Sequence, residues 1–142
     1  MRILIDADGC PVVDITVLAA KENNIECIIL CDTSHVFEKE GARTITVSKG
    51  ADSVDFALVN MIEPGDIVIT QDYGLAAMCL AKKAVTVSQD GRIYDDSNIN
   101  SLLSARHYSK KIRSAGGRTK GPSKRTSEQD KRFEHTLVSL IK

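Results

Sequence analysis

The sequence contains no tryptophan, and only three tyrosines and three phenylalanines occur among its 142 residues. Aromatic surfaces on which unpaired bases could stack are therefore scarce. No apolar run approaches the roughly 20 residues that a membrane-spanning helix needs. The first residues also lack the basic segment and the long apolar stretch of a secretory signal. These absences argue against a membrane protein and favour a cytoplasmic one.

The four cysteines lack the paired CxxC spacing that is typical of a zinc site. Three of them, Cys27, Cys31 and Cys79, lie in apolar segments. Free cysteines are often buried and behave as small hydrophobic residues. We therefore expect reduced, buried thiols, as in proteins of the cytoplasm.

Net charge is also absent, because 19 basic side chains balance 19 acidic ones. Taken alone, this balance argues against a strongly basic nucleic-acid-binding protein. The charges are segregated along the chain, however. Residues 1–105 contain 8 Lys and Arg against 16 Asp and Glu, whereas residues 106–132 contain 10 against 2. Such segregation predicts an acidic site and a basic site that have different partners.

Short apolar runs alternate with amphipathic segments over most of the chain. Strands are expected at residues 2–6, 25–31, 43–47, 66–70 and 84–88, and helices at 11–23, 52–62, 73–83 and 99–105. Continuous apolar strands that alternate with helices are typical of a parallel sheet covered on both faces. The predicted fold class is therefore α/β, a three-layer sandwich whose central sheet has about five strands, mainly parallel. The order of the strands cannot be read from the sequence.

The last quarter of the chain has a different character. Residues 106–126 are rich in Gly, Ser, Lys and Arg and show no apolar period, so they are expected to form a basic loop. Thr126 and Gln129 have the spacing of a capping box, which predicts a closing helix over residues 127–141. An apolar stripe should dock this helix on the core, and it consists of Phe133, Leu137, Leu140 and Ile141. The whole chain, 1–142, is then one domain.

Aspartates stand where the predicted strands end or the following helices begin. They are Asp6 and Asp8 after the first strand, Asp32 after the second, Asp72 after the fourth, and Asp52 and Asp55 at the start of a helix. The carboxyl ends of parallel strands meet at one edge of a sheet, where ligands bind. We therefore expect these carboxylates to lie close together.

Neighbouring carboxylates repel one another unless a proton or a cation is present. Oxygen ligands without His or Cys suit Mg²⁺ or Mn²⁺. The expected metal ligands are Asp6, Asp8, Asp52, Asp55 and Asp72. Helix capping is the alternative for any single acid, because Asp52 and Asp72 stand where an N-cap residue is wanted.

Four residues of the basic segment are candidates for nucleic-acid binding: Arg118, Lys120, Lys124 and Arg125. Cations at this density contact phosphates well, and Arg can do so with two parallel hydrogen bonds. The expected partner is RNA or single-stranded DNA. A solvated loop without a partner is one alternative, and attraction of the loop to the acidic edge of the same molecule is another.

Four motifs in the chain resemble those of a known family. They are ILIDADGCPV at 3–12, GADSVD at 50–55, TQDYGLA at 70–76 and KGPSKRT at 120–126. By these motifs the chain is similar, over nearly its whole length, to the YaiI/YqxD family of uncharacterised bacterial proteins. That family resembles PIN-like domains, which are α/β nucleases with carboxylate-bound Mg²⁺ or Mn²⁺.

The resemblance implies roles for individual residues. Asp6 matches the first PIN acid, Asp52 or Asp55 the second, and Thr70-x-Asp72 the motif that follows the fourth strand. The pair Asp6-x-Asp8 and the long basic loop depart from the common PIN pattern. A metal-dependent nuclease is therefore expected, in which Asp6, Asp8 and Asp72 are catalytic and a metal-activated water attacks the phosphodiester in line.

Two other functions stay open at this point. The chain could bind nucleic acid without catalysis. The segment IDADGC also resembles the phosphatase motif of haloacid dehalogenases, in which Asp6 would be the phosphorylated nucleophile and Asp8 the general acid, although Cys10 stands where Thr is usual. The sequence leaves the oligomeric state open, a homodimer included.

Overall fold

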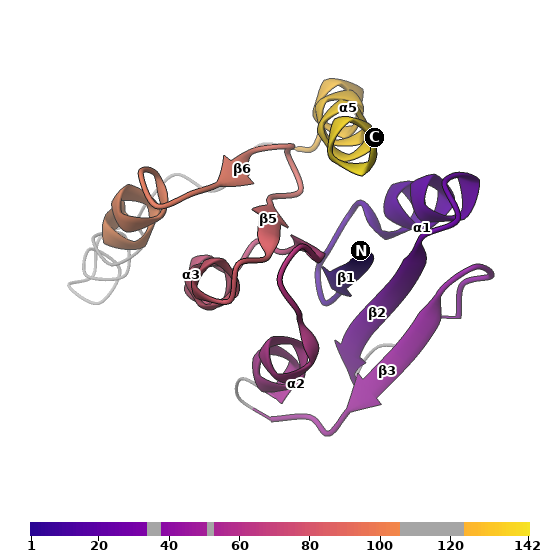
Figure 1. Cartoon of the computed structure of the whole chain (residues 1–142), viewed down its shortest axis with the longest axis horizontal. Helices are drawn as coiled ribbons and strands as arrows, with labels where there is room; N and C mark the ends of the chain where they lie inside the picture. The colour runs from indigo at the N-terminus through magenta and orange to yellow at the C-terminus, as the bar shows by residue number, and fades with distance from the viewer. Residues whose placement is uncertain (34–37, 51–52, 106–123) are drawn as a thin grey trace.

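The computed structural model describes residues 1–33, 38–50, 53–105 and 124–142. They form an α/β fold in which helices pack around a central sheet (Figure 1). The strands are β1 (Arg2–Asp6), β2 (Glu26–Asp32), β3 (Arg43–Val47), β4 (Ile67–Ile69), β5 (Val85–Val87) and β6 (Ile93–Tyr94). The helices are α1 (Val13–Glu22), α2 (Ser53–Met61), α3 (Tyr73–Ala81) and α5 (Ser127–Ile141), and residues 99–105 are also helical.

The strands form one sheet in the order β3-β2-β1-β4-β5-β6. All neighbours are parallel except β5 and β6, which are antiparallel. The expectation of a mainly parallel sheet is confirmed, but the sheet has six strands where about five were predicted. The additional strand, β6, has only two residues. Such a segment is too short to show a period of alternating side chains.

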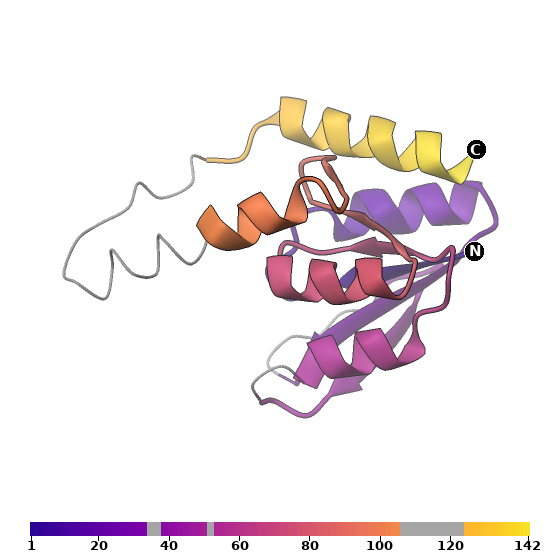
Figure 2. The ribbon, with the colours of Figure 1, turned by 60° about the vertical axis from the view of Figure 1, so that its left-hand side comes forward.

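The sheet is the middle of three layers. Helices α1 and α5 lie side by side over one face, and α2 and α3 cover the other (Figures 1 and 2). Alternate side chains of β1 point to opposite faces, as the period of a strand requires. Ile3 and Ile5 belong to the core that includes residues of α1 and α5, whereas Leu4 belongs to the core under α2 and α3.

The closing helix begins and ends as expected. The Thr126 hydroxyl accepts a hydrogen bond from the Gln129 backbone, and the Gln129 side chain accepts one from the Thr126 backbone, so the capping box is confirmed. Phe133 and Leu137 are fully buried. Leu140 and Ile141 are partly buried and pack against the same core. The predicted apolar stripe therefore docks α5 on the body of the protein.

The cysteines follow the expectation of free thiols. None of the four forms a disulfide in the described structure, and Cys27, Cys31 and Cys79 are buried. Among the helices of the described ranges, none combines the length and the apolar character needed to cross a bilayer.

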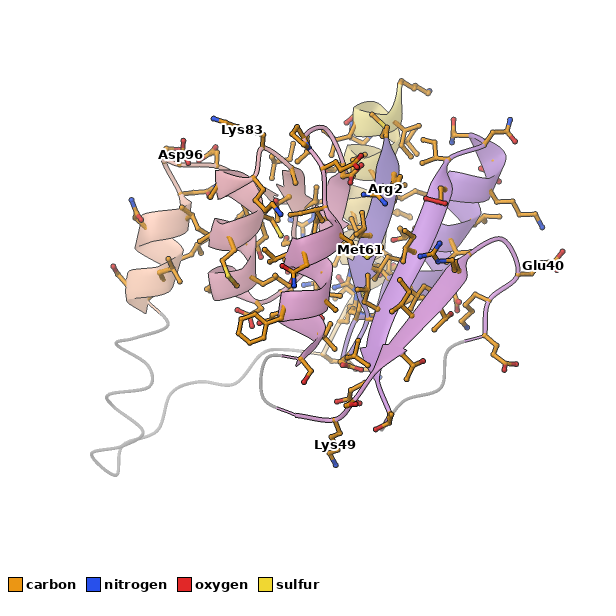
Figure 3. All side chains as sticks on the ribbon, turned by 60° about the horizontal axis from the view of Figure 1, so that its bottom comes forward. Arg2, Glu40, Lys49, Met61, Lys83 and Asp96 are labelled. Carbon is orange, nitrogen blue, oxygen red and sulfur yellow. The ribbon has the colours of Figure 1, made fainter. Side chains whose placement is uncertain are left out.

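An ion pair closes the amino end of the central strands. The Asp66 carboxylate accepts hydrogen bonds from the Arg2 guanidinium at 2.8 Å, from the Arg2 backbone at 3.2 Å and from the Glu63 backbone at 2.9 Å. The same guanidinium donates to the Met61 carbonyl oxygen, and Figure 3 shows Arg2 and Met61 near each other. Burial acts to raise the pKa of Asp66, but the hydrogen bonds and the charge of Arg2 outweigh it, so the pKa is lowered.

Asp66→Asn should therefore destabilise the protein by about 2 kcal/mol at pH 7, the range typical of hydrogen bonds to charged groups. An acid with a lowered native pKa stabilises the fold above its ordinary pKa, and the contribution is lost as the pH falls through the native pKa. The difference from wild type should consequently shrink under acid. Urea unfolding at several pH values measures it. The exposed Asp96 (Figure 3) provides the matched control, and equal effects of Asp66→Asn and Asp96→Asn would contradict the prediction.

Candidate functional site

A cavity of about 610 Å³ opens at the carboxyl ends of the central strands. The residues following β1 and β4 line it, together with the first turns of α2 and α3. Strand β1 has β2 on one side and β4 on the other, so the chain leaves these strands in opposite directions at this point of the sheet. In open α/β sheets, ligands bind where the strand order reverses in this way.

Five carboxylates face this cavity. They belong to Asp6, Asp8, Asp32, Asp55 and Asp72. No Lys, Arg or His is among the described residues that line it, although Lys49 lies near the same end of the sheet (Figure 3). The structure thus brings together the predicted acids that it describes. Asp52 lies outside the described residues.

Asp6 and Asp72 are connected through one hydroxyl group. The Thr70 hydroxyl donates to Asp6 Oδ2 at 2.8 Å and accepts from the Asp72 backbone N–H at 3.0 Å. Thr70 is almost fully buried, and its carbonyl oxygen accepts a hydrogen bond from the Tyr94 hydroxyl at 3.3 Å. Since both bonds of the hydroxyl are used, Thr70 fixes the position of the strand-end acids relative to each other.

Asp72 also caps a helix. Its Oδ1 atom accepts hydrogen bonds from the backbones of Gly74 at 2.9 Å and Leu75 at 3.2 Å, so it is the N-cap residue of α3. The alternative interpretation of this acid, helix capping, is therefore confirmed. Capping does not remove Asp72 from the cavity, which it also lines. It orients the carboxylate at the cavity wall.

Asp8 is held by a tight turn after β1. Gly9 adopts a φ of +73°, and the Cys10 backbone donates to the Ala7 carbonyl oxygen at 3.0 Å. The left-handed conformation is one that Gly adopts without strain. Asp8 Oδ2 in turn accepts a hydrogen bond from the Asp32 backbone at 3.3 Å. The turn thereby connects the ends of β1 and β2 at the cavity.

The electrostatics of the cavity oppose the charge of Asp6. Burial raises the pKa of Asp6, and the charges of Asp72 and Asp8 raise it further, while the hydrogen bond from Thr70 acts in the opposite direction. Perturbation of this kind, by burial and like charges in a cleft, is typical of functional sites. A bound cation would relieve the repulsion.

The thiol of Cys10 lines the same cavity, and burial raises its pKa to about 11. The charge of Asp6 raises it as well, whereas Arg125 acts to lower it. Because only the thiolate is a strong nucleophile, Cys10 stays protonated and unreactive at neutral pH.

The chemistry of the donor set fits a hard divalent ion, since every charged group of the cavity wall described above is a carboxylate. Within the described ranges, no three acidic, His or Cys side chains are grouped closely enough to form a metal cage. Mg²⁺ commonly uses one or two carboxylates and keeps several waters. The cavity therefore suits a partly hydrated ion rather than a fully enclosed one.

Two residues of the site were not predicted as such. Thr70 appeared in a motif but was given no role, and Asp32 was expected at the same edge of the sheet but not as a metal ligand. The signal for Asp32 was its place directly after a buried strand. The signal for Thr70 was a hydroxyl side chain two residues before the strand-end acid Asp72.

The predicted nucleic-acid-binding residues are only partly described. Arg118 and Lys120 lie outside the described residues, and Lys124 is exposed. The Arg125 guanidinium donates to Asp130 at 2.7 Å, to Asp90 at 2.8 Å and to the Gln89 carbonyl oxygen at 2.6 Å. Arg125 thus fastens the start of α5 to the turn after β5, and these partners are not acids of the strand-end edge. Its contact with nucleic acid stays a prediction.

Comparison with known proteins adds relatives of similar length. Residues 4–142 match the family described as "Uncharacterized BCR, YaiI/YqxD family". A UPF0178 protein of Exiguobacterium sibiricum is 52% identical, covering 99% of this chain and 96% of its own. A UPF0178 protein of Ruminiclostridium cellulolyticum is 51% identical over 100% and 93% of the two chains. No solved structure gives a significant match. The chain therefore belongs to the YaiI/YqxD family.

Proposed function

We propose that the protein is a metal-dependent nuclease that hydrolyses phosphodiester bonds of RNA or single-stranded DNA in the cytoplasm. The observation that carries the proposal is the cavity at the reversal of strand order, whose described wall has five carboxylates and no cationic side chain. The resemblance to PIN-like domains supports the same activity.

The residues of the cavity would have different roles in the reaction. Asp6, Asp8, Asp72, Asp55 and Asp52 are the candidate ligands of Mg²⁺ or Mn²⁺; one or two of them would bind the ion directly and the others would contact its waters. The ion, when bound, supplies charge neutralisation and an activated water. Thr70 positions Asp6 against Asp72 and is a positioning residue rather than a catalytic one. Arg118, Lys120 and Lys124 would contact flanking phosphates, a contribution that depends little on sequence and strongly on salt.

The charge of the cavity also bears on the phosphatase alternative. A phosphate monoester carries up to two negative charges, whereas a phosphodiester carries one. Repulsion from the five carboxylates is therefore greater for a monoester, and no Lys, Arg or His of the described wall offsets it. Asp6 is also accepting a hydrogen bond from Thr70, which occupies one oxygen of the would-be nucleophile. These features favour a diester substrate.

The assay uses the purified full chain with end-labelled single-stranded RNA, single-stranded DNA and p-nitrophenyl phosphate. We expect Mn²⁺ or Mg²⁺ to permit cleavage of a single-stranded polynucleotide, EDTA to stop it, and p-nitrophenyl phosphate to stay intact. Turnover of p-nitrophenyl phosphate would instead support the phosphatase. Oligonucleotide binding that persists in EDTA, with every polynucleotide intact in Mn²⁺, would replace the proposal with a non-catalytic binding protein.

A further inference from the structure

A second hollow, of about 470 Å³, lies between the turn after β5 and helix α5. We call it the basic groove. It is lined by Arg92, Lys131, Arg132 and His135, and by Asp90, Gly91 and Thr136. None of these residues was part of the site predicted from the sequence.

The walls of the basic groove are held together by close contacts. Gly91 has a φ of +83°, and a Cβ atom at this position would lie 2.7 Å from the backbone oxygen of Arg132. The Thr136 hydroxyl donates to the Gly91 carbonyl oxygen at 2.9 Å. Only a glycine permits the turn to approach α5 this closely. The groove is thus built by the fold and is not a chance gap between exposed side chains.

The basic groove has an excess of positive charge. The one acid that lines it, Asp90, is already paired with Arg125 at 2.8 Å. Arg92, Lys131 and Arg132 are exposed, and within the described residues no carboxylate forms an ion pair with them. Glu134 and Lys131 both line a smaller hollow next to the groove. The surplus of cations would attract a polyanion.

A third hollow, of about 160 Å³, lies beside both the basic groove and the acidic cavity. It shares Gln71 and Tyr73 with the cavity, and Asp90 and Arg92 with the groove. The three hollows are therefore neighbours, and together, from the strand-end carboxylates past the β5–β6 turn to α5, we call them the track.

The middle of this track contains an aromatic pair. The rings of Tyr73 and Tyr94 meet edge to face, with centroids 6.0 Å apart, and Tyr94 is buried. Tyr73 is only partly buried and lines both the cavity and the third hollow. An unpaired base can stack on such a ring, whereas the bases of a duplex are stacked inside the helix. The track therefore suits a single strand.

We infer that the basic groove is a binding site for the phosphate backbone of a single-stranded polynucleotide. Arg92, Lys131 and Arg132 neutralise successive phosphates, and Tyr73 receives a base as the strand passes toward the acidic cavity. The inference rests on the proposed function for its direction, because the strand leads to the carboxylates that would cleave it. It assigns to described residues of the β5–β6 turn and of α5 a contact that the sequence predicted only for the basic loop.

The test compares two triple variants that lose the same charge. The first is Arg92→Gln, Lys131→Gln and Arg132→Gln. The control is Lys39→Gln, Arg43→Gln and Lys83→Gln, whose residues line none of the three hollows; Figure 3 shows Lys83 away from the cavity end of the sheet. Fluorescence anisotropy measures the binding of labelled single-stranded RNA, single-stranded DNA and duplex DNA in EDTA, over a range of salt concentrations.

We expect the groove variant to bind single strands about tenfold more weakly or worse. Its slope of log affinity against log salt should become shallower by about 2, since each lost phosphate contact removes about 0.7. The control should match wild type. Comparison of the RNA and DNA arms identifies which single strand binds more tightly. Equal affinities of the two variants, or a duplex that binds as tightly as the single strands, would overturn the inference.

A cleavage assay on the same samples separates this inference from the proposed function. If the groove variant binds weakly in EDTA and the wild type never cleaves in Mn²⁺, the groove is a binding site but the protein is not a nuclease. If the groove variant binds like wild type and the wild type cleaves in Mn²⁺, the inference about the groove is wrong and the proposed nuclease activity is supported.

Discussion

Asp6→Asn should abolish metal-dependent cleavage and at the same time make the folded protein more stable at pH 7. The loss of activity should be at least about 100-fold, because even residues that merely support a metal ligand change metal affinity or activity by 10–100-fold. Asn is nearly isosteric with Asp, and its side-chain oxygen can still accept the hydrogen bond from Thr70. The fold should therefore survive, while the charge that attracts the ion is lost.

The gain in stability follows from the sign of the pKa shift. Burial and the charges of Asp72 and Asp8 raise the pKa of Asp6, so the native state binds its proton more tightly than the unfolded state does. Ionisation of Asp6 thus costs stability, and this cost grows as the pH rises through the native pKa. Asn carries no charge at any pH. The melting temperature of the variant should exceed that of wild type at pH 7, and the difference should disappear at acidic pH.

Thermal unfolding with and without Mn²⁺ measures both effects. Wild type should be stabilised by Mn²⁺, since a ligand that binds only the native state raises the melting temperature. Asp6→Asn should respond weakly to the ion. Asp96→Asn, an exposed substitution of the same chemistry, should behave like wild type in every arm. Undiminished cleavage by Asp6→Asn, or a lower melting temperature at pH 7, would refute this account of the cavity.

Phe133→Ala should cause the largest loss of stability, about 3–5 kcal/mol, as expected for the removal of a buried aromatic side chain. Phe133 is fully buried, and it belongs to the core between the sheet and helices α1 and α5. Its replacement leaves a cavity and weakens the attachment of α5. Since α5 forms one wall of the basic groove, binding of single strands should fall as well.

Phe56→Ala is the matched control for this substitution. Phe56 lies in α2 with 62% of its surface exposed, so its removal should change the free energy of unfolding by less than about 0.5 kcal/mol. Chemical denaturation of both variants, followed by circular dichroism, gives the two values. A cost at Phe133 no larger than that at Phe56 would mean that α5 does not stabilise the body of the protein.

Local patterns in the sequence were sufficient for most individual elements. The bounds of β1 and β3 were predicted to the residue, as was the start of α5 from Thr126 and Gln129. These predictions succeeded because a short apolar run or a capping box is decided by neighbouring residues. The helix expected to reach Lys83 ends instead at Ala81, and Lys83 adopts a φ of +67°. A non-glycine residue in the left-handed region is not foreseen from composition.

Features that depend on residues far apart in the chain could not be predicted from the sequence. The position of β1 between β2 and β4 depends on how all the helices pack, and β6 exists only because β5 offers it a partner. The grouping of the acids could be predicted from the rule about strand ends, without the strand order. The bridging role of Thr70 could not be predicted from the sequence. It depends on the relative positions of Asp6 and Asp72, which are 66 residues apart in the chain.

The pairing of α1 with α5 has a consequence for synthesis of the chain. Helix α1 is made before α5, the helix that lies beside it over the same face of the sheet (Figure 2). Domains beyond about 100 residues often expose apolar surface transiently while they fold. The part of the α1 and sheet surface that α5 covers stays exposed until translation reaches α5, so a ribosome stalled before residue 127 holds a chain with an open hydrophobic surface. Forms truncated before α5 should accordingly depend on chaperones more than chains that include α5.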